Sequence, residues 1–260
     1  MRSVAAIASF SAWTAIASPC RASEGDSLED RVLLGFTVGY AQLRDDLVRP
    51  LRSAGPQFGV GAEYEHRGEA LSHHASVALG AGMLDDRFAN RTLSLAATAS
   101  YALSANVLRR PTASLWIGGR ARAAVFDQYH ADWDDSHLYW LTAYDLGPSA
   151  WARVALPLGE VGAELLLPVC AVVGRPPEFR YGKIDRLKSI GNYFAQPNEE
   201  LELASLDRYR AIASQISWTV FRSEHQLVRV SYGFDYRYAS FPREVEILTH
   251  AIGIGAGHAF

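Results

Sequence analysis

Residues 228–238 read VRVSYGFDYRY, and large apolar or aromatic side chains occupy every second position of this stretch. Val228, Val230 and Tyr232 begin one face, whereas Arg229 and Ser231 begin the opposite face, which is polar or small throughout. Successive side chains of a β-strand point to opposite faces of its sheet, so this period of two predicts a strand with one apolar and one polar face. The stretch is about as long as a tilted strand must be to cross the hydrocarbon of a membrane.

The same alternation recurs along the whole chain. It predicts about ten strands, at residues 32–41, 58–67, 72–82, 92–103, 113–125, 138–156, 161–173, 212–221, 228–238 and 246–260. The connections between these strands are of two kinds that alternate along the chain. One kind is short, and the other is mostly longer, polar and charged, with 42–57 and 174–209 as its longest members. Short turns at one rim and long loops at the other are typical of an outer-membrane barrel, with the turns on the periplasmic side.

The predicted fold is therefore all-β, an up-and-down antiparallel transmembrane β-barrel of about ten strands with long extracellular loops. Twelve strands is the alternative count, if the long sixth segment and the loop at 174–209 contain further strands. Within that loop we expect short helices at 184–194 and 197–203. A loop of this length is usually functional, and it could fold over the mouth of the barrel or into its lumen.

The last residues, 252–260, read IGIGAGHAF and alternate strictly up to a terminal aromatic, Phe260. This segment resembles the closing strand of bacterial outer-membrane barrels, whose terminal Phe is recognised by the barrel-assembly machinery. The resemblance implies that Phe260 is an assembly signal and that this machinery is a partner during biogenesis.

The first residues have the three parts of a signal peptide. Arg2 supplies the positive charge, residues 4–17 are apolar, and Cys20 and Ala22 place small residues at the positions read by a signal peptidase. We therefore expect a signal peptide at 1–22 and an outer-membrane barrel domain at 23–260. Cleavage would leave Cys170 as the single cysteine, which excludes an internal disulfide.

Composition limits the function further. The formal net charge of −3 gives no electrostatic reason to expect nucleic acid as a partner. A hydrophobic content of 49% fits a barrel, in which lipid-facing and lumenal residues alternate, and fits a soluble β-sandwich equally well. No zinc spacing, Walker loop or dinucleotide fingerprint is present, so the sequence predicts neither a metal site nor a cofactor.

Charged residues of both signs occupy predicted inward positions. A lumen of about ten strands is narrow, and charges inside it must be paired or hydrated, so these side chains are expected to interlock as a network that plugs the barrel. The alternative is a small pore that favours anions and is lined by the arginines. The residues are Glu63, Glu65, Arg120, Arg122, Arg153, Glu164, Arg229, Asp235 and Arg237.

Two acidic clusters lie in predicted extracellular loops: Asp85 and Asp86 in one, and Asp135 with His137 in another. An aspartate pair and an Asp–His pair on a ten-stranded barrel resemble the omptin surface proteases, in which such groups activate a water. The resemblance implies Asp85, Asp86, Asp135 and His137 as candidate catalytic residues. Without catalysis, acidic loop tips suit solvent or divalent cations that bridge lipopolysaccharide.

These features favour a non-enzymatic outer-membrane protein with a structural or surface-binding role. Its expected partners are outer-membrane lipid and lipopolysaccharide. A small pore and a surface hydrolase are the two alternatives, and the sequence does not fix the oligomeric state.

Overall fold

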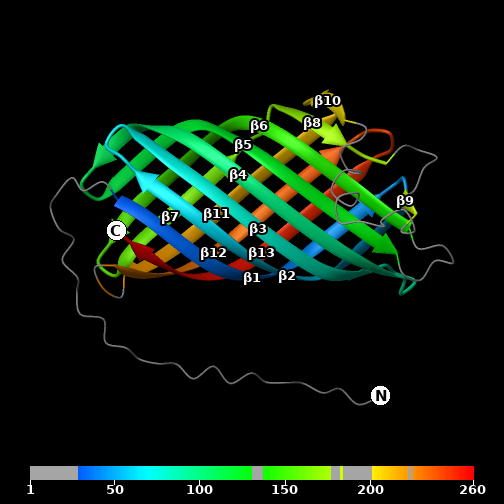
Figure 1. Ribbon diagram of the computed structural model, residues 1–260, viewed down its shortest axis with the longest axis horizontal. Coiled ribbons are helices and arrows are strands. Elements are labelled where there is room, and N and C mark those ends of the chain that lie inside the picture. Colours follow the sequence, from blue (N-terminus) through cyan, green and yellow to red (C-terminus); the bar gives the residue numbers. More distant parts are fainter. Residues whose placement is uncertain (1–28, 131–136, 177–181, 184–200, 222, 224) are drawn as a thin grey trace, which may run out of the picture.

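The computed structural model describes residues 29–130, 137–176, 182–183, 201–221, 223 and 225–260. In these ranges the chain forms one antiparallel sheet that closes into a barrel (Figure 1). Its strands are β1 (Glu29–Asp45), β2 (Arg49–Arg67), β3 (Leu71–Asp85), β4 (Arg91–Arg110), β5 (Ala113–His130), β6 (His137–Leu156), β7 (Gly159–Leu166), β8 (Cys170–Gly174), β9 (Gly182–Lys183), β10 (Leu201–Ser205), β11 (Tyr209–Phe221), β12 (Gln226–Ala239) and β13 (Val245–Ala259). The described ranges hold no helix long and apolar enough to cross a membrane.

Ten strands close the barrel, in the order β6-β5-β4-β3-β2-β1-β13-β12-β11-β7, with β7 pairing back onto β6. The predicted up-and-down antiparallel barrel is therefore confirmed. The first and last strands are neighbours, in register from Arg31 opposite Ala259 to Asp45 opposite Val245. The predicted signal peptide at 1–22 lies outside the described residues.

The predicted seventh strand is interrupted around Pro168. Before the break in the chain, β7 pairs with residues 149–156 of β6. After the break, β8 pairs with residues 142–146 of the same strand. A proline has no N–H to give to a ladder, which accounts for a break at this position. β8 then pairs on its other edge with β10, so the predicted helix at 197–203 is wrong over residues 201–203. The open edge of β8 offers these residues ladder hydrogen bonds, which override their local helix propensity.

The strands are longer than the alternation predicted. Residues 42–57, expected to be a loop, belong mostly to β1 and β2, which meet at a turn of residues 46–48. The apolar alternation marks only the part of a strand in contact with lipid, whereas backbone pairing continues beyond it into water. We call the end of the barrel near β9 and β10 the loop rim. The opposite end, next to the C-terminus at the left of Figure 1, is the turn rim. It holds the connections between β2 and β3, β4 and β5, β6 and β7, and β11 and β12.

The outer face is apolar along the middle of the strands. On β1 the outward side chains Leu34, Phe36 and Val38 remain exposed, at 66%, 49% and 46%. The apolar run on this strand, 32–40, is about 20 Å tall for a strand tilted by about 40°, close to the apolar band of outer-membrane barrels.

Apolar side chains also fill part of the interior, on the side of the loop rim. They come from nine of the thirteen strands and are almost fully buried. Phe126 and Leu141 face each other across β5 and β6. We call this set the apolar layer: Ala41, Leu43, Leu84, Phe126, Leu141, Ala143, Ala171, Val173, Ala204, Tyr209, Ala239, Phe241, Val245 and Ile247.

Candidate functional site

The rest of the lumen is dominated by charged side chains, which gather in three clusters. The turn-end cluster is Arg31, Glu65, Arg67, Arg153 and Glu160. The central cluster is Glu63, His74, Arg120, Glu164 and Arg229. The loop-side cluster is Arg122, Asp145, Tyr209, Asp235 and Arg237.

The turn-end cluster is built around the carboxylate of Glu160, near the start of β7. Arg31 on β1 donates to it from two nitrogens, at 2.5 and 3.1 Å, and Arg67 on β2 at 3.0 and 3.3 Å. Arg153 on β6 adds Nε at 3.2 Å. Arg67 also donates from Nε to Glu65, at 2.6 Å. The cluster therefore joins strands from opposite walls, and Arg31 is only 1% exposed.

An aromatic stack supports this cluster from the side. The indole rings of Trp116 and Trp151 are parallel within 2°, with centroids 5.1 Å apart. The guanidinium of Arg67 lies over Trp151, 5.4 Å from the ring centroid. A cation over an indole face is favourable, and more so where water is excluded.

The central cluster places an imidazole between two carboxylates. Arg229 donates to Glu63 at 2.7 Å, and Arg120 forms an ion pair with Glu164. His74 Nδ1 lies 3.7 Å from Glu164 Oε1, and its Nε2 lies 3.9 Å from Glu63 Oε2. Arg120 Nη2 lies 2.7 Å from His74 Nδ1. His74 Nδ1 thus lies next to both Arg120 and Glu164, and its Nε2 faces Glu63.

The loop-side cluster connects β5, β6, β11 and β12. Arg122 pairs with Asp145 at 2.8 Å and with Asp235 at 3.2 Å. Arg237 holds the other side of Asp235 at 2.5 Å, and the hydroxyl of Tyr209 donates to Asp145 at 2.9 Å. Each carboxylate thus has at least two donors, which offsets the cost of burying it.

One further buried pair lies near the loop rim. Arg175 Nη2 donates to Asp45 Oδ1 at 2.7 Å, and the amide of Gln128 donates to Asp45 Oδ2 at 2.8 Å. Arg175 and Asp45 are both at most 3% exposed.

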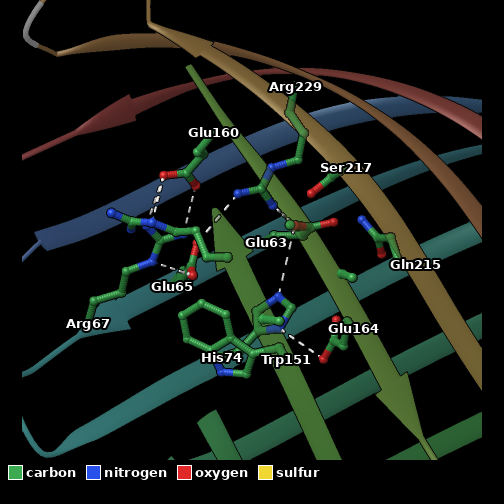
Figure 2. A pocket seen from close by; sticks show the side chains of 14 residues that line it. Glu63, Glu65, Arg67, His74, Trp151, Glu160, Glu164, Gln215, Ser217 and Arg229 are labelled. Carbon is green, nitrogen blue, oxygen red and sulfur yellow. Dashed lines mark hydrogen bonds and ion pairs between the residues drawn. The ribbon is translucent and has the colours of Figure 1, made fainter. Parts of the chain in front are cut away.

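A polar cavity lies between the turn-end and central clusters (Figure 2). Its volume is about 520 Å³, including the part open to solvent, and it is lined from β2, β3, β6, β7, β11 and β12. Beside the charged groups its wall carries Trp151, Gly162, Gln215 and Ser217. The space that water-sized molecules can occupy in it is about 60 Å³, which is room for a few waters.

The structure places all nine of the predicted lumen charges in these clusters, each in at least one ion pair. Sequence reasoning missed other buried charged residues of the lumen: Arg31, Arg67, Glu160, Asp145, Asp45 and Arg175. Most were signalled by the alternation itself. Arg31 lies two residues before Leu33 on β1, and Arg67 two residues after Glu65 on β2, so both continue the inward face of their strand. Asp145 lies six residues before Trp151, an even number, and therefore shares its inward face of β6.

Of the four residues of the omptin-like resemblance, the structure describes the side chains of Asp85 and Asp86 alone, so their placement relative to Asp135 and His137 stays a prediction. Asp85 ends β3, and Asp86 accepts from the backbone N–H groups of Phe88 and Asn90 at 2.7 and 3.1 Å, which fixes the turn before β4. His137 begins β6, and its side chain and the whole of Asp135 lie outside the description. The carboxylate of Asp86 therefore has a structural task.

Among the described residues, no group of three or more His, Cys, Asp or Glu side chains is arranged to hold a metal ion.

Known structures share the architecture. The outer membrane protease OmpT from Escherichia coli is 10% identical and superposes with a TM-score of 0.53 over 94% of this chain and all of that one. The translocator domain of the autotransporter NalP from Neisseria meningitidis is 11% identical, with a TM-score of 0.45 over 91% of this chain and 90% of that one. The sequence matches no family model and no curated protein. The superposition on OmpT thus shows that this chain has the β-barrel fold of that outer-membrane protein.

Proposed function

We propose that this chain is an exported protein of the bacterial outer membrane whose barrel does not conduct ions and which acts at its surface. Its role is structural or surface-binding, as a stable barrel that presents its loop rim to the outside. The single observation that carries the proposal is the filling of the lumen at two levels.

The first level is the apolar layer. Side chains such as Leu141 and Val173 have no exposed area, and Leu43 and Phe126 have 3% each. An ion or a file of water crossing this layer would lose its hydration without finding polar partners, which is costly. The second level consists of ion pairs between strands that are not neighbours in the sheet, such as Arg31 with Glu160 and Arg229 with Glu63.

The outer face near the loop rim supports contact with lipopolysaccharide. Arg210, Tyr238, Glu246, Arg44 and Arg52 lie side by side on five consecutive strands, just beyond the apolar band. Arg52 is largely exposed and pairs with Glu246 at 3.2 Å. Arginines suit the phosphates of a lipid headgroup, and carboxylates suit the divalent cations that bridge such phosphates.

The test is single-channel conductance of refolded residues 23–260 in a planar bilayer. Insertion is checked independently by the shift in gel migration on heating. A fully inserted protein is expected to be electrically silent over a wide range of voltages. Stable anion-selective steps whose size changes with Arg120→Ala or Arg229→Ala would overturn the proposal and make the protein a small pore.

A further inference from the structure

Two histidines lie next to each other on the outer face of the barrel, close to the turn rim. His66 of β2 and His73 of β3 are directly opposite each other in the ladder, near the turn that joins the two strands. The centroids of their rings are 5.7 Å apart. Side chains that stand directly opposite in antiparallel strands are close enough to act together, so the two imidazoles form a pair.

Each imidazole of the pair is held by one nitrogen from its outer side. His66 Nδ1 lies 2.8 Å from Oδ1 of Asp30 on β1. His73 Nδ1 lies 2.5 Å from the hydroxyl of Tyr101 on β4. These two partners come from opposite sides of the pair, because the strand order is β1-β2-β3-β4. The two nitrogens of an imidazole lie on different sides of the ring, so each Nε2 is turned back toward the space between β2 and β3. For His66 the direction is also seen from the turn, since a Cβ at Gly68 would stand 3.7 Å from its Nε2.

The carboxylate of Asp30 fixes the position of the proton on His66. An ionised carboxylate can only accept, so Nδ1 of the neutral ring donates and Nε2 carries the lone pair. The hydroxyl of Tyr64 donates to the same oxygen of Asp30 at 2.7 Å and holds the carboxylate in place. In the part of the chain that the structure describes, neither Nε2 of the pair has a hydrogen bond or an ion pair. A histidine that binds a metal usually donates its other ring N–H to a carboxylate or another acceptor in this way.

The pair can be reached from water. The side chain of His66 is 29% exposed, and Asp30 beside it precedes the apolar run of β1, which begins at Val32. Tyr64 and Tyr101 are the next outward residues along β2 and β4, and aromatic residues at the edge of the apolar band are typical of the headgroup level. Water can therefore complete the coordination of an ion held by the two imidazoles.

We propose that His66 and His73 form a binding site for a divalent transition-metal ion such as Cu²⁺ or Zn²⁺, held by both Nε2 atoms. Imidazole suits these ions, whereas Mg²⁺ and Ca²⁺ prefer oxygen ligands. Metal–nitrogen bonds of about 2 Å place the centroids of two such rings roughly 5–6 Å apart, and the observed separation is 5.7 Å.

The described residues hold no cluster of three His, Cys, Asp or Glu side chains that could bind a metal. The ion therefore has two ligands from the protein and keeps water in its other positions, which makes the site weaker than a closed structural site. Binding ties β2 to β3 next to their turn, and it stabilises the folded barrel because the ligands are brought together only there.

The test is calorimetric titration of refolded residues 23–260, without a histidine tag, with Cu²⁺, Zn²⁺ and Mg²⁺ in detergent. The protein carries Cys170→Ser, which removes its only thiol as a competing ligand. Cu²⁺ is expected to bind more tightly than Zn²⁺, and Mg²⁺ not to bind. The electron paramagnetic resonance spectrum of the Cu²⁺ form should show splitting by imidazole nitrogen. Equal affinities for Cu²⁺ and Mg²⁺, no Cu²⁺ binding at micromolar concentration, or a Cu²⁺ spectrum without nitrogen splitting would overturn the proposal.

Three variants assign the binding to this pair. His66→Gln and His73→Gln are each expected to lower the affinity for Cu²⁺ at least tenfold and to remove the rise in melting temperature that Cu²⁺ causes. Asp30→Asn keeps both imidazoles but removes the carboxylate behind His66, and it should lower the affinity by about tenfold. Folding of each variant is checked by the shift in gel migration on heating.

The matched control is His250→Gln. His250 also lies on the outer face and has a tyrosine hydroxyl on its Nδ1, that of Tyr232 at 2.7 Å, but its described ring neighbours are Tyr232 and Phe234, not a second histidine. Its loss should leave Cu²⁺ binding unchanged. Full affinity in folded His66→Gln, or an equal loss in His250→Gln, would contradict the site.

Discussion

The carboxylate of Glu160 is contacted by three arginines from three different strands, β1, β2 and β6. This one carboxylate offsets part of the desolvation of all three guanidiniums, so removing it leaves more buried positive charge than any single arginine carries. A residue near the beginning of a short strand thereby holds together segments that are far apart in the sequence.

Replacing Glu160 with Gln should therefore destabilise the barrel. The substitution keeps the size of the side chain but removes the buried negative charge that Arg31, Arg67 and Arg153 share, and breaking a buried ion pair costs about 3–5 kcal/mol. The measurement is urea-induced unfolding of the protein refolded into lipid vesicles, followed by tryptophan fluorescence.

The matched control is Glu246→Gln, which removes the partner of Arg52 on the outer face, where the arginine is 64% exposed. Exposed pairs contribute about 0–1 kcal/mol, so this variant should unfold almost like the unmodified protein. Equal losses for Glu160→Gln and Glu246→Gln would show that burial does not set the strength of the lumenal pairs.

The sequence predicted which face each lumenal residue occupies but not its partners. Alternation on a single strand is a local property, and it placed Glu63 and Arg229 inward. That these two meet at 2.7 Å depends on the order of strands around the barrel and on the shear between them. Glu160 was missed because the sequence places it directly after Pro157-Leu-Gly159, at the end of a predicted turn, where alternation has only begun.

At the scale of the elements, the β6–β7 turn depends on one backbone conformation. Gly159 has a φ of +136°, a region that side chains rarely adopt, and a Cβ there would lie 2.1 Å from the carbonyl oxygen of Thr219. The turn thus fits tightly against β11, and it positions Glu160, the next residue.

Gly159→Ala is expected to lower the free energy of unfolding by about 1–3 kcal/mol, the usual cost of a strained backbone conformation. Gly119→Ala is the comparison, since the nearest atom to a Cβ at Gly119 is a carbonyl oxygen 4.0 Å away. An alanine in a strand with space for it is neutral or stabilises by up to about 1 kcal/mol. Thermal unfolding of both variants in the same detergent measures the difference, and similar melting temperatures would contradict this explanation.

The strands themselves were largely predictable, and their ends were not. Eight of the ten segments of alternation lie wholly within single strands of the barrel, the seventh is broken around Pro168 and the tenth runs one residue past β13. β1 and β2 continue through residues 42–45 and 49–57. In this region Arg44 and Arg52 face outward, so a search for apolar positions stops too early. The break at Pro168 and the pairing of β10 with β8 depend on contacts between distant segments, which no local pattern contains.

For the whole molecule, the apolar band and the row of Arg44, Tyr238 and Glu246 above it predict where the membrane lies. Phe36 is near the middle of the band, whereas Tyr238 is at its edge. An arginine on the lipid face costs about 2–4 kcal/mol at the midplane and about 0–1 kcal/mol near the interface. Unfolding in vesicles should therefore show a large loss for Phe36→Arg and a small one for Tyr238→Arg. The reverse order would place the membrane elsewhere on the barrel.

The pairing of β1 with β13 also has a consequence for synthesis. The sheet has two unpaired edges until its last strand exists, and each edge is a template for pairing with other chains. A chain that ended before β13 would thus form a sheet with two open, aggregation-prone edges in place of a barrel. Closure of the barrel therefore depends on residues 245–259, because this strand pairs with β1 on one side and with β12 on the other.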